Sequence, residues 1–224
     1  MSKQSRGDKG EQKVISVLNE QKEYAKVINN LTLDGQSGMT HQIDHIYICD
    51  RGVFVIESKS YYGKINVNLN DSIWIKEVKN KRERMPNPIT QNKSHVRIVK
   101  RTLNKDYPIV SVVVFTLNNA PYFPNENVIN LDDLSLFLQE YPLPKVLNKQ
   151  EIDNIESVLL KHESYTNMDD HLNNIKAIKK QRIESHKEIA YALENRKCPR
   201  CQSPIIEKKN NLFSCTKCDF YFHL

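Results

Sequence analysis

Two carboxylates and a lysine stand in a pattern that suits the hydrolysis of a phosphodiester bond. Asp44 lies in one apolar run, and Glu57 and Lys59 close the next, with a turn at 50–51 between them. Alternation along a strand puts Glu57 and Lys59 on one face. If the turn closes a hairpin, residue 44 faces residue 57, with Cβ atoms about 5 Å apart. A bulge at Gly52 would shift that register.

Carboxylates this close repel each other unless a divalent cation lies between them. Mg²⁺ or Mn²⁺ fits two carboxylates together with waters and a phosphate oxygen. Lys59 could then orient the attacking water or stabilise charge growing on the phosphorus. The pattern alone is weak, since Asp44 could end a strand and Glu57 and Lys59 could line a solvated edge. The apolar runs around them nevertheless predict a buried strand pair. Charged side chains are costly to bury there unless they are paired or bind a metal ion.

Periodicity and turn residues predict the elements that would hold these side chains. Helical spacing is expected over 8–20, 88–103, 132–139, 149–163 and 168–196, with Asn87 as the cap of the second helix. Strand-like runs are 24–33, 43–49, 53–59, 64–69, 72–78, 109–116 and 127–129. Residues 79–87 read as a basic polar loop. The basic segment 76–84 and the basic residues of the helix at 88–103 could flank a DNA groove, although charge runs are usually solvated faces.

Several motifs occur in one order along the first 135 residues. They are Gly10-Glu11, Ile43-Asp44-His45-Ile46, Gly52-Val53-Phe54-Val55-Ile56-Glu57-Ser58-Lys59, Gly63-Lys64-Ile65, Trp74 and Asn87-Pro88-Ile89-x-Gln91. This set resembles the nuclease-related domain called NERD, a branch of the PD-(D/E)xK nuclease superfamily, over roughly residues 6–135.

The resemblance implies an α/β fold with a restriction-endonuclease-like, four-stranded mixed central sheet flanked by helices. It also implies a Mg²⁺- or Mn²⁺-dependent site. In that site Asp44, Glu57 and the backbone carbonyl of Ser58 would be metal ligands, and Lys59 would be the catalytic lysine.

Two further site residues follow from the resemblance. Glu11 would lie near the metal from the first helix, and Gln91 would point into the site from the later one. Without the resemblance, Glu11 could equally be an exposed first-turn carboxylate and Gln91 an ordinary surface residue. Some branches carry a tyrosine four residues after this glutamine, where the present chain has His95, so the role of His95 is left open.

Four cysteines predict a second, structural metal site. Cys198, Cys201, Cys215 and Cys218 form two C-x-x-C pairs, a pattern typical of tetrahedral Zn²⁺. Four thiolates and one Zn²⁺ sum to −2. The segment resembles the four-cysteine zinc fingers of bacterial type I topoisomerases, which bind DNA. His223 is not expected to be a ligand, because four cysteines complete the shell.

The same segment mixes cations with aromatic rings, which suits single-stranded nucleic acid. The residues concerned are Lys208, Lys209, Lys217, Phe220, Tyr221 and Phe222. A purely structural module, or one that docks on a protein, is the alternative.

Length and composition fit a compact α/β protein with a small appendage. The chain has 224 residues, with 33 lysines and arginines against 27 acidic residues, a net charge of +6 that favours an anionic partner. No apolar run could span a membrane and no signal peptide is seen, so a cytoplasmic location is expected. The predicted domains are a nuclease-like domain at 1–145, a helical linker at 146–196 and a zinc ribbon at 197–224.

Together these features predict a metal-dependent nuclease that hydrolyses DNA, with the zinc ribbon assisting DNA binding. Two alternatives stay open from the sequence. One is a nucleic-acid-binding module that keeps the nuclease fold without catalysis. The other is an adaptor whose ribbon docks on another protein.

Overall fold

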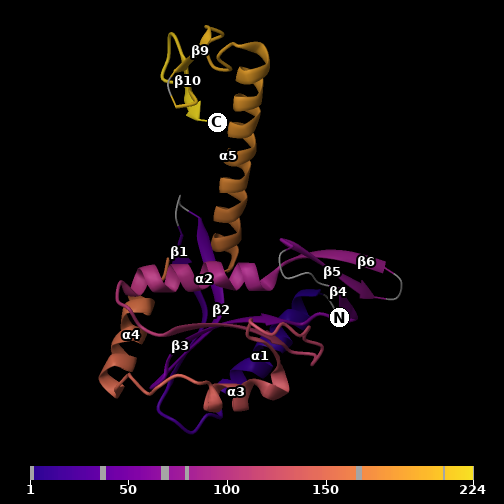
Figure 1. Cartoon of the computed structure of the whole chain (residues 1–224), viewed down its shortest axis with the longest axis vertical. Helices are drawn as coiled ribbons and strands as arrows, with labels where there is room; N and C mark the ends of the chain where they lie inside the picture. The colour runs from indigo at the N-terminus through magenta and orange to yellow at the C-terminus, as the bar shows by residue number, and fades with distance from the viewer. Residues whose placement is uncertain are drawn as a thin grey trace. The chain divides into compact units, whose positions relative to one another are not determined.

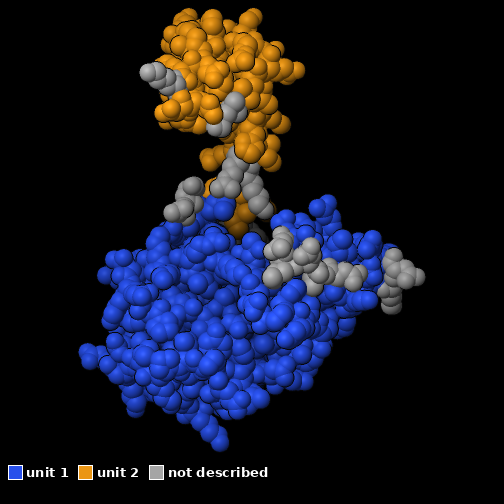
Figure 2. All heavy atoms as spheres, viewed as in Figure 1, with its two compact units in different colours: residues 1–171 blue, residues 172–224 orange. Residues whose placement is uncertain are grey.

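The computed structural model describes residues 3–35, 39–66, 71–78, 81–164, 168–208 and 210–223. The chain divides into two compact units, residues 1–171 and 172–224 (Figure 2). The sequence predicted domain boundaries after residues 145 and 196. That the three segments fold as separate domains stays a prediction. In this division, the helix Lys149–Lys161 lies in the first unit, and most of the helix Met168–Asn195 lies in the second.

The first unit is built on a five-stranded mixed sheet in the order β1-β2-β3-β7-β8. These strands are β1 (Lys26–Asp34), β2 (Thr40–Cys49), β3 (Gly52–Lys59), β7 (Ile109–Phe115) and β8 (Val128–Asn130). The first three are antiparallel, whereas β3 with β7 and β7 with β8 are parallel. The sheet has one strand more than the four we expected. The extra edge strand, β8, pairs with only three residues of β7, too short a run for the sequence to assign a neighbour.

The hairpin of β2 and β3 has the register predicted from its turn. Pairing runs from Cys49 opposite Gly52 to His45 opposite Ile56 without a bulge. Gly52 has φ 142°, and a Cβ there would lie 2.5 Å from the Pro108 carbonyl oxygen, so glycine is required. The next pair in this register is Asp44 and Glu57.

Helices cover both faces of the sheet (Figure 1). On one face lie α2 (Pro88–Leu103) and α4 (Lys149–Lys161), and on the other lie α1 (Lys3–Asn19) and α3 (Leu134–Glu140), which follows a 3-10 turn at Leu131–Asp133. Side chains of β3 alternate between them: Val53 and Val55 pack towards α2 and α4, and Phe54 and Ile56 towards α1 and α3. The odd-numbered positions of β3, which include Glu57 and Lys59, therefore face α2.

Side-chain hydrogen bonds hold helix α2 in place at Asn87, its N-terminal cap, and again at Asn92, about one turn later. The Asn87 side chain accepts hydrogen bonds from the backbone N–H groups of Ile89 (2.9 Å) and Thr90 (3.4 Å), as the predicted cap should. The fully buried Asn92 donates to the Val55 and Val112 carbonyl oxygens at 2.8 and 3.0 Å and to a serine hydroxyl. These bonds set the distance of α2 from the β3–β7 pair.

A second, antiparallel sheet is inserted between β3 and α2. It contains β4 (Lys64–Asn66), β5 (Ile73–Val78) and β6 (Lys81–Pro86). The loop expected at 79–87 was therefore wrong where β6 lies. The strand was missed because its many charged side chains are typical of a loop. In the structure, charged side chains of β5 and β6 form ion pairs across the two strands: Lys76 with Glu83 at 3.1 Å and Arg82 with Glu77 at 2.9 Å. Trp74 is core, as expected. Of the strand predicted at 64–69, residues 67–69 lie outside the described residues.

The second unit joins the end of a long helix to a small sheet. Its elements are α5 (Met168–Asn195, in this unit from Leu172), β9 (Ile205–Lys208), β10 (Leu212–Cys215) and β11 (Tyr221–His223), with strand order β11-β10-β9. Ala192 of α5 packs in one core with Phe213, Phe220 and Phe222. Two of the three aromatic residues expected to meet nucleic acid, Phe220 and Phe222, are thus buried in this core, and the expectation was wrong for them. Among the described residues, no helix is both long and apolar enough to cross a membrane.

The contacts of Asn92 lead to a stability prediction. Asn92→Ala leaves two buried carbonyl oxygens with one partner fewer, and we expect the free energy of unfolding of the first unit to fall by about 2 kcal/mol. Urea unfolding followed by the fluorescence of Trp74, the single tryptophan, measures this. Thr90→Ala, on the exposed side of α2, is the control and should change stability little. Equal stability of the two variants would contradict the anchoring role.

Candidate active site and metal centre

Asp44 is held at the end of β3 by Ser58. Its Oδ2 accepts hydrogen bonds from the Ser58 backbone N–H at 2.8 Å and from the Ser58 hydroxyl at 3.1 Å. The β2–β3 pairing brings these two residues together, because Asp44 directly precedes His45, the last residue of β2 that is paired with β3. His45 points to the opposite face, where its Nδ1 donates to Asn29 Oδ1 at 2.8 Å. The carboxylate of Asp44 is therefore fixed while remaining half-buried.

Glu57 is the centre of the charged cluster. It is 1% exposed and forms an ion pair with Lys59, two residues along the same face. From α2, the Nδ1 atom of buried His95 lies 3.3 Å from Glu57 Oε2. The role that the sequence left open for His95 now has a physical basis, since the imidazole contacts a predicted metal ligand. The Q-x-x-x-Y spacing was the one signal that pointed to this position.

Mutual electrostatics shift the pKa values of this cluster. Burial, and then the charge of Glu57, raise the pKa of Asp44 to about 7, against the opposing effect of Lys59. Burial also favours neutral Glu57, but Lys59 and His95 outweigh it and hold the pKa of that carboxyl below its usual value. Burial disfavours charged Lys59, yet Glu57, Tyr61 and Asp44 outweigh it and raise the pKa of the ammonium. Asp44 is thus the carboxyl of the pair that retains its proton up to a pH of about 7.

Helix α1 approaches the ends of β3 and β7 closely at Gly10. A Cβ at Gly10 would lie 1.9 Å from Ser60 Oγ, which is itself hydrogen-bonded to Thr116 Oγ1 at 2.6 Å. The next residue, Glu11, has a pKa raised by burial and by Asp8, with contributions from Lys59 and Glu57. Glu11 therefore lies within the electrostatic reach of the cluster.

Gln91 is placed differently. It is half-buried in the first turn of α2, and no hydrogen bond from its side chain to another described residue is found. The structure brings together Asp44, Glu57, Ser58 and Lys59, with Glu11 within electrostatic range. It shows no side-chain contact between Gln91 and this group.

A pocket of about 390 Å³ opens beside the cluster. Ser58 to Tyr62 line one side, and Lys76, Val78 and Glu83 of the inserted sheet line the other. Lys76 lies over the Tyr61 ring, 5.3 Å from its centroid. The lysine of the cluster therefore lines an open space bounded by cations and aromatic rings, which suits a phosphate with an attached nucleotide.

The donor set fits a hard divalent cation. Buried Glu57 Oε2 makes no hydrogen bond within the part of the chain described, and Asp44 carries a raised pKa that a cation would reverse. The clusters of three or more histidine, cysteine or acidic ligands found among the described residues do not include this pair. The protein thus offers two carboxylates, leaving positions for a carbonyl oxygen, water and phosphate, as Mg²⁺ prefers.

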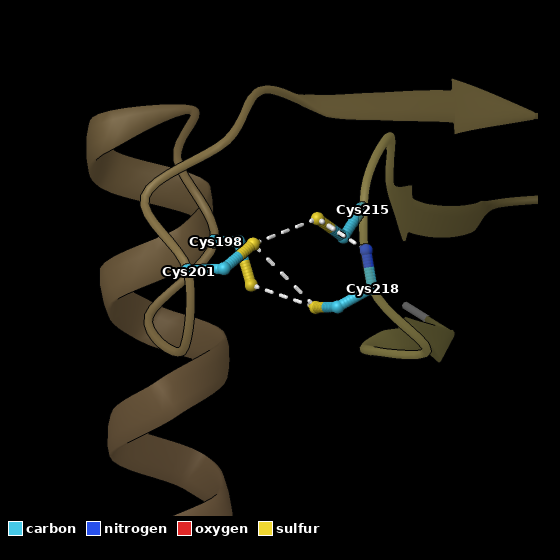
Figure 3. Close-up of side chains that lie close together, drawn as sticks. All are labelled: Cys198, Cys201, Cys215 and Cys218. Carbon is cyan, nitrogen blue, oxygen red and sulfur yellow. Dashed lines mark hydrogen bonds between the residues drawn. The ribbon is translucent and has the colours of Figure 1, made fainter.

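The four cysteines of the second unit converge as predicted (Figure 3). Sulfur–sulfur distances are 3.5 Å for Cys198 and Cys218, 3.4 Å for Cys201 and Cys215, and 3.6 Å for Cys201 and Cys218. A tetrahedron with Zn–S bonds of about 2.3 Å has edges of about 3.8 Å, whereas a disulfide needs about 2.05 Å. The four thiols are free and arranged to bind one metal ion such as zinc.

Backbone groups form hydrogen bonds with sulfur atoms of this site. The N–H groups of Lys217 and Cys218 donate to Cys215 Sγ at 3.3 and 3.4 Å. The backbone of Ser203, followed by its hydroxyl, lowers the pKa of Cys201 to about 6. The lowered pKa of Cys201 favours its deprotonated form, which is the form that binds a metal.

A second group of possible ligands, Glu23, Cys49 and Asp50, has another explanation. Arg51 donates to both oxygens of Glu23, at 2.8 and 2.9 Å, and the Tyr47 hydroxyl donates to the same carboxylate at 2.8 Å. Lys145 pairs with Asp50 at 2.8 Å. These ion pairs already balance the charges, so the group is a structural network around the β2–β3 turn.

A mixed sheet covered by helices on both faces, with D…E-x-K side chains at the end of a central hairpin, defines the nuclease-like class of α/β proteins. Comparison with known proteins agrees. Residues 6–116 match the family described as the nuclease-related domain, NERD. An uncharacterised protein of Bacillus anthracis is 28% identical over 160 residues, covering 69% of this chain and 74% of that protein. No solved structure matches significantly. The resemblance of the ribbon to topoisomerase zinc fingers is not supported by these comparisons.

The pKa of Asp44 predicts pH-dependent metal binding. Because folding raises this pKa, the metal-free protein favours protonated Asp44 and loses stability as the pH rises through about 7. A bound cation needs the ionised form, whose fraction rises from about one tenth at pH 6 to about nine tenths at pH 8. The affinity for Mn²⁺, measured by electron paramagnetic resonance of the free ion, should therefore rise about tenfold over this range. Asp44→Asn keeps an acceptor for Ser58 and should lose the dependence. An equal affinity at both pH values would contradict Asp44 as a ligand.

The cysteine site predicts a local effect of metal loss. Cys215→Ser should lower the zinc content, measured by elemental analysis, from one atom per chain to near zero, and should unfold the small sheet. Urea unfolding followed by Trp74 should stay unchanged, because Trp74 packs in the first unit. Cys49→Ser, which alters a buried cysteine outside the site, is the control and should retain zinc. Full zinc binding by the Cys215 variant would contradict the assignment.

Proposed function

We propose that this protein is a Mg²⁺- or Mn²⁺-dependent deoxyribonuclease of the PD-(D/E)xK type that hydrolyses DNA phosphodiester bonds. One observation carries the proposal. Asp44, Glu57 and Lys59 meet at the end of β3, next to an open pocket, and Asp44 has a pKa that calls for a cation. The match of residues 6–116 to the NERD family supports it at the level of a nuclease-related function.

Asp44, Glu57 and the Ser58 carbonyl oxygen would hold the divalent cation. When bound, that ion supplies Lewis-acid stabilisation of the negative charge on the phosphate. Asp44 is held in position by two hydrogen bonds from Ser58, and Glu57 by its contact with His95. His95 is thus a positioning residue in this proposal.

Lys59 would orient the attacking water and stabilise charge in the transition state. Its raised pKa keeps the ammonium charged, so it acts as a hydrogen-bond donor and not as a base. The water oxygen forms the new bond to phosphorus, one phosphorus–oxygen ester bond breaks, and the leaving oxygen takes up a proton. Glu11 would add negative charge close to the cation. Gln91, in the first turn of α2, would contact the substrate.

The four-cysteine site would hold a structural Zn²⁺, and the unit around it would assist DNA binding. The charge of the chain and the exposed cations of the ribbon support this role. A cytoplasmic location stays a prediction.

Cleavage of DNA by a lysine variant tests the proposal. With Mn²⁺ or Mg²⁺, the parent should nick or degrade supercoiled plasmid or linear single strands, and Lys59→Ala should lower the rate at least about a hundredfold. Lys22→Ala, an exposed lysine on the first unit, is the matched control and should cut as the parent does. If Lys59→Ala cuts at the parent rate, the site is wrongly assigned. If no substrate is cut although DNA binds, the non-catalytic binding module is the correct function.

A further inference from the structure

The two units of the chain differ sharply in charge. Residues 172–224 contain 11 lysines and arginines against 5 acidic residues, a net charge of +6. Residues 1–171 contain 22 of each and are formally neutral. Four thiolates with one Zn²⁺ would reduce the charge of the second unit by 2 and still leave it clearly positive. The net positive charge of the chain therefore lies entirely in the unit with the four cysteines. A polyanion would be attracted electrostatically to that unit.

The small sheet of that unit has one covered face and one open face. Phe213 and Phe222 are paired across β10 and β11, their rings stacked with centroids 5.1 Å apart, in the core that includes Ala192 of α5. Successive residues of a strand point to opposite faces. The neighbours of these two phenylalanines therefore point away from the core.

The open face carries two aligned rows of side chains. In one row, Ser214 of β10 lies between Tyr221 of β11 and Ile206 of β9. In the other, Leu212 lies between His223 and Lys208. Tyr221 is 67% exposed, and Ile206, Lys208 and His223 are also exposed. Ser214, between Tyr221 and Ile206, is half-buried, and its hydroxyl oxygen is covered.

We propose that this open face is a stacking platform for single-stranded DNA. Tyr221 would stack on an unpaired base and Ile206 would extend the apolar surface. Lys208 would contact a phosphate. A sheet face with an exposed ring on one edge strand and a lysine on the other matches the way unpaired strands are bound, since every base has a face to stack and every linkage a charge.

The exposed tyrosine favours a single strand over a duplex on this face. A duplex would present phosphates to the cations but no exposed base face to Tyr221, so the aromatic row would be unused. A binding site in the charged unit also complements the first unit, where the pocket beside Lys59 lies on a neutral body. The choice of DNA over RNA rests on the proposed function.

Binding measurements on the full chain with zinc test the proposal. Lys59→Ala is used as the parent, so that the strand is not cut, and fluorescence anisotropy follows a labelled oligothymidylate of about 15 nucleotides without Mg²⁺ or chelator. Tyr221→Ala should weaken binding at least about fivefold, the lower limit for loss of one stacked base. Tyr221→Phe keeps the ring and should bind within about twofold of the parent. Lys208→Gln should reduce the slope of log affinity against log salt by about 0.7.

The matched control is Tyr122→Ala, which removes an even more exposed tyrosine, 86% exposed, from the neutral unit and should leave binding unchanged. Zinc content of one atom per chain in each variant shows that the ribbon is folded. Parent-like affinity of a zinc-loaded Tyr221→Ala variant would overturn the proposal. Tighter binding of a duplex than of the single strand, or of oligouridylate than of oligothymidylate, would also overturn it.

The outcome is separable from that of the nuclease proposal. If plasmid is never cut but Tyr221 governs binding to the single strand, the platform stands and the proposed nuclease function fails. If Lys59-dependent cutting is seen but Tyr221→Ala binds as its parent does, the nuclease function stands and the platform fails.

Discussion

The pairing of β2 with β3 is the constraint on which the candidate site depends. It brings Asp44 next to the residues at the end of β3, and one residue of slippage would move Asp44 to the opposite face, away from Glu57 and Lys59. The register is fixed by burial on both faces and by Gly52, whose backbone conformation and close contact with Pro108 exclude other residues. Local turn chemistry and core packing therefore cooperate to place two carboxylates side by side.

Helix α2 completes the site from a distance in the sequence. Asn92 anchors the helix to carbonyl oxygens of β3 and β7, and His95, three residues later, then reaches Glu57. A buried glutamate with a lysine and a histidine as partners stays ionised, and that charge in turn helps to raise the pKa of Asp44. The cluster is thus arranged so that the charge of one carboxylate is compensated within the protein, whereas the other carboxyl favours its protonated form unless a further cation is bound.

The candidate site and the net positive charge lie in different units of the chain. The neutral first unit holds the carboxylates, the lysine and the pocket, and the positive second unit holds the four cysteines and a sheet with an open face. Under the proposed function, a formally neutral first unit would avoid binding a cleaved product too tightly, whereas the positive unit would retain a long polyanion through many weak contacts. The packing of Ala192 against the ribbon core makes α5 part of that unit and not only a connection to it.

The sequence by itself determined the strand register, the Asn87 cap and the four-cysteine site, because each depends on residues close together along the chain or on a fixed spacing. It also predicted Asp44, Glu57 and Lys59 as site residues, through turn geometry and the NERD motifs, and their role stays a prediction. Tertiary structure alone decided which aromatic residues of the ribbon are buried, that β6 is a strand and β8 an added edge, and that His95 contacts Glu57. These outcomes depend on packing between segments far apart in the sequence, where cross-strand ion pairs and a shared core override what composition suggests.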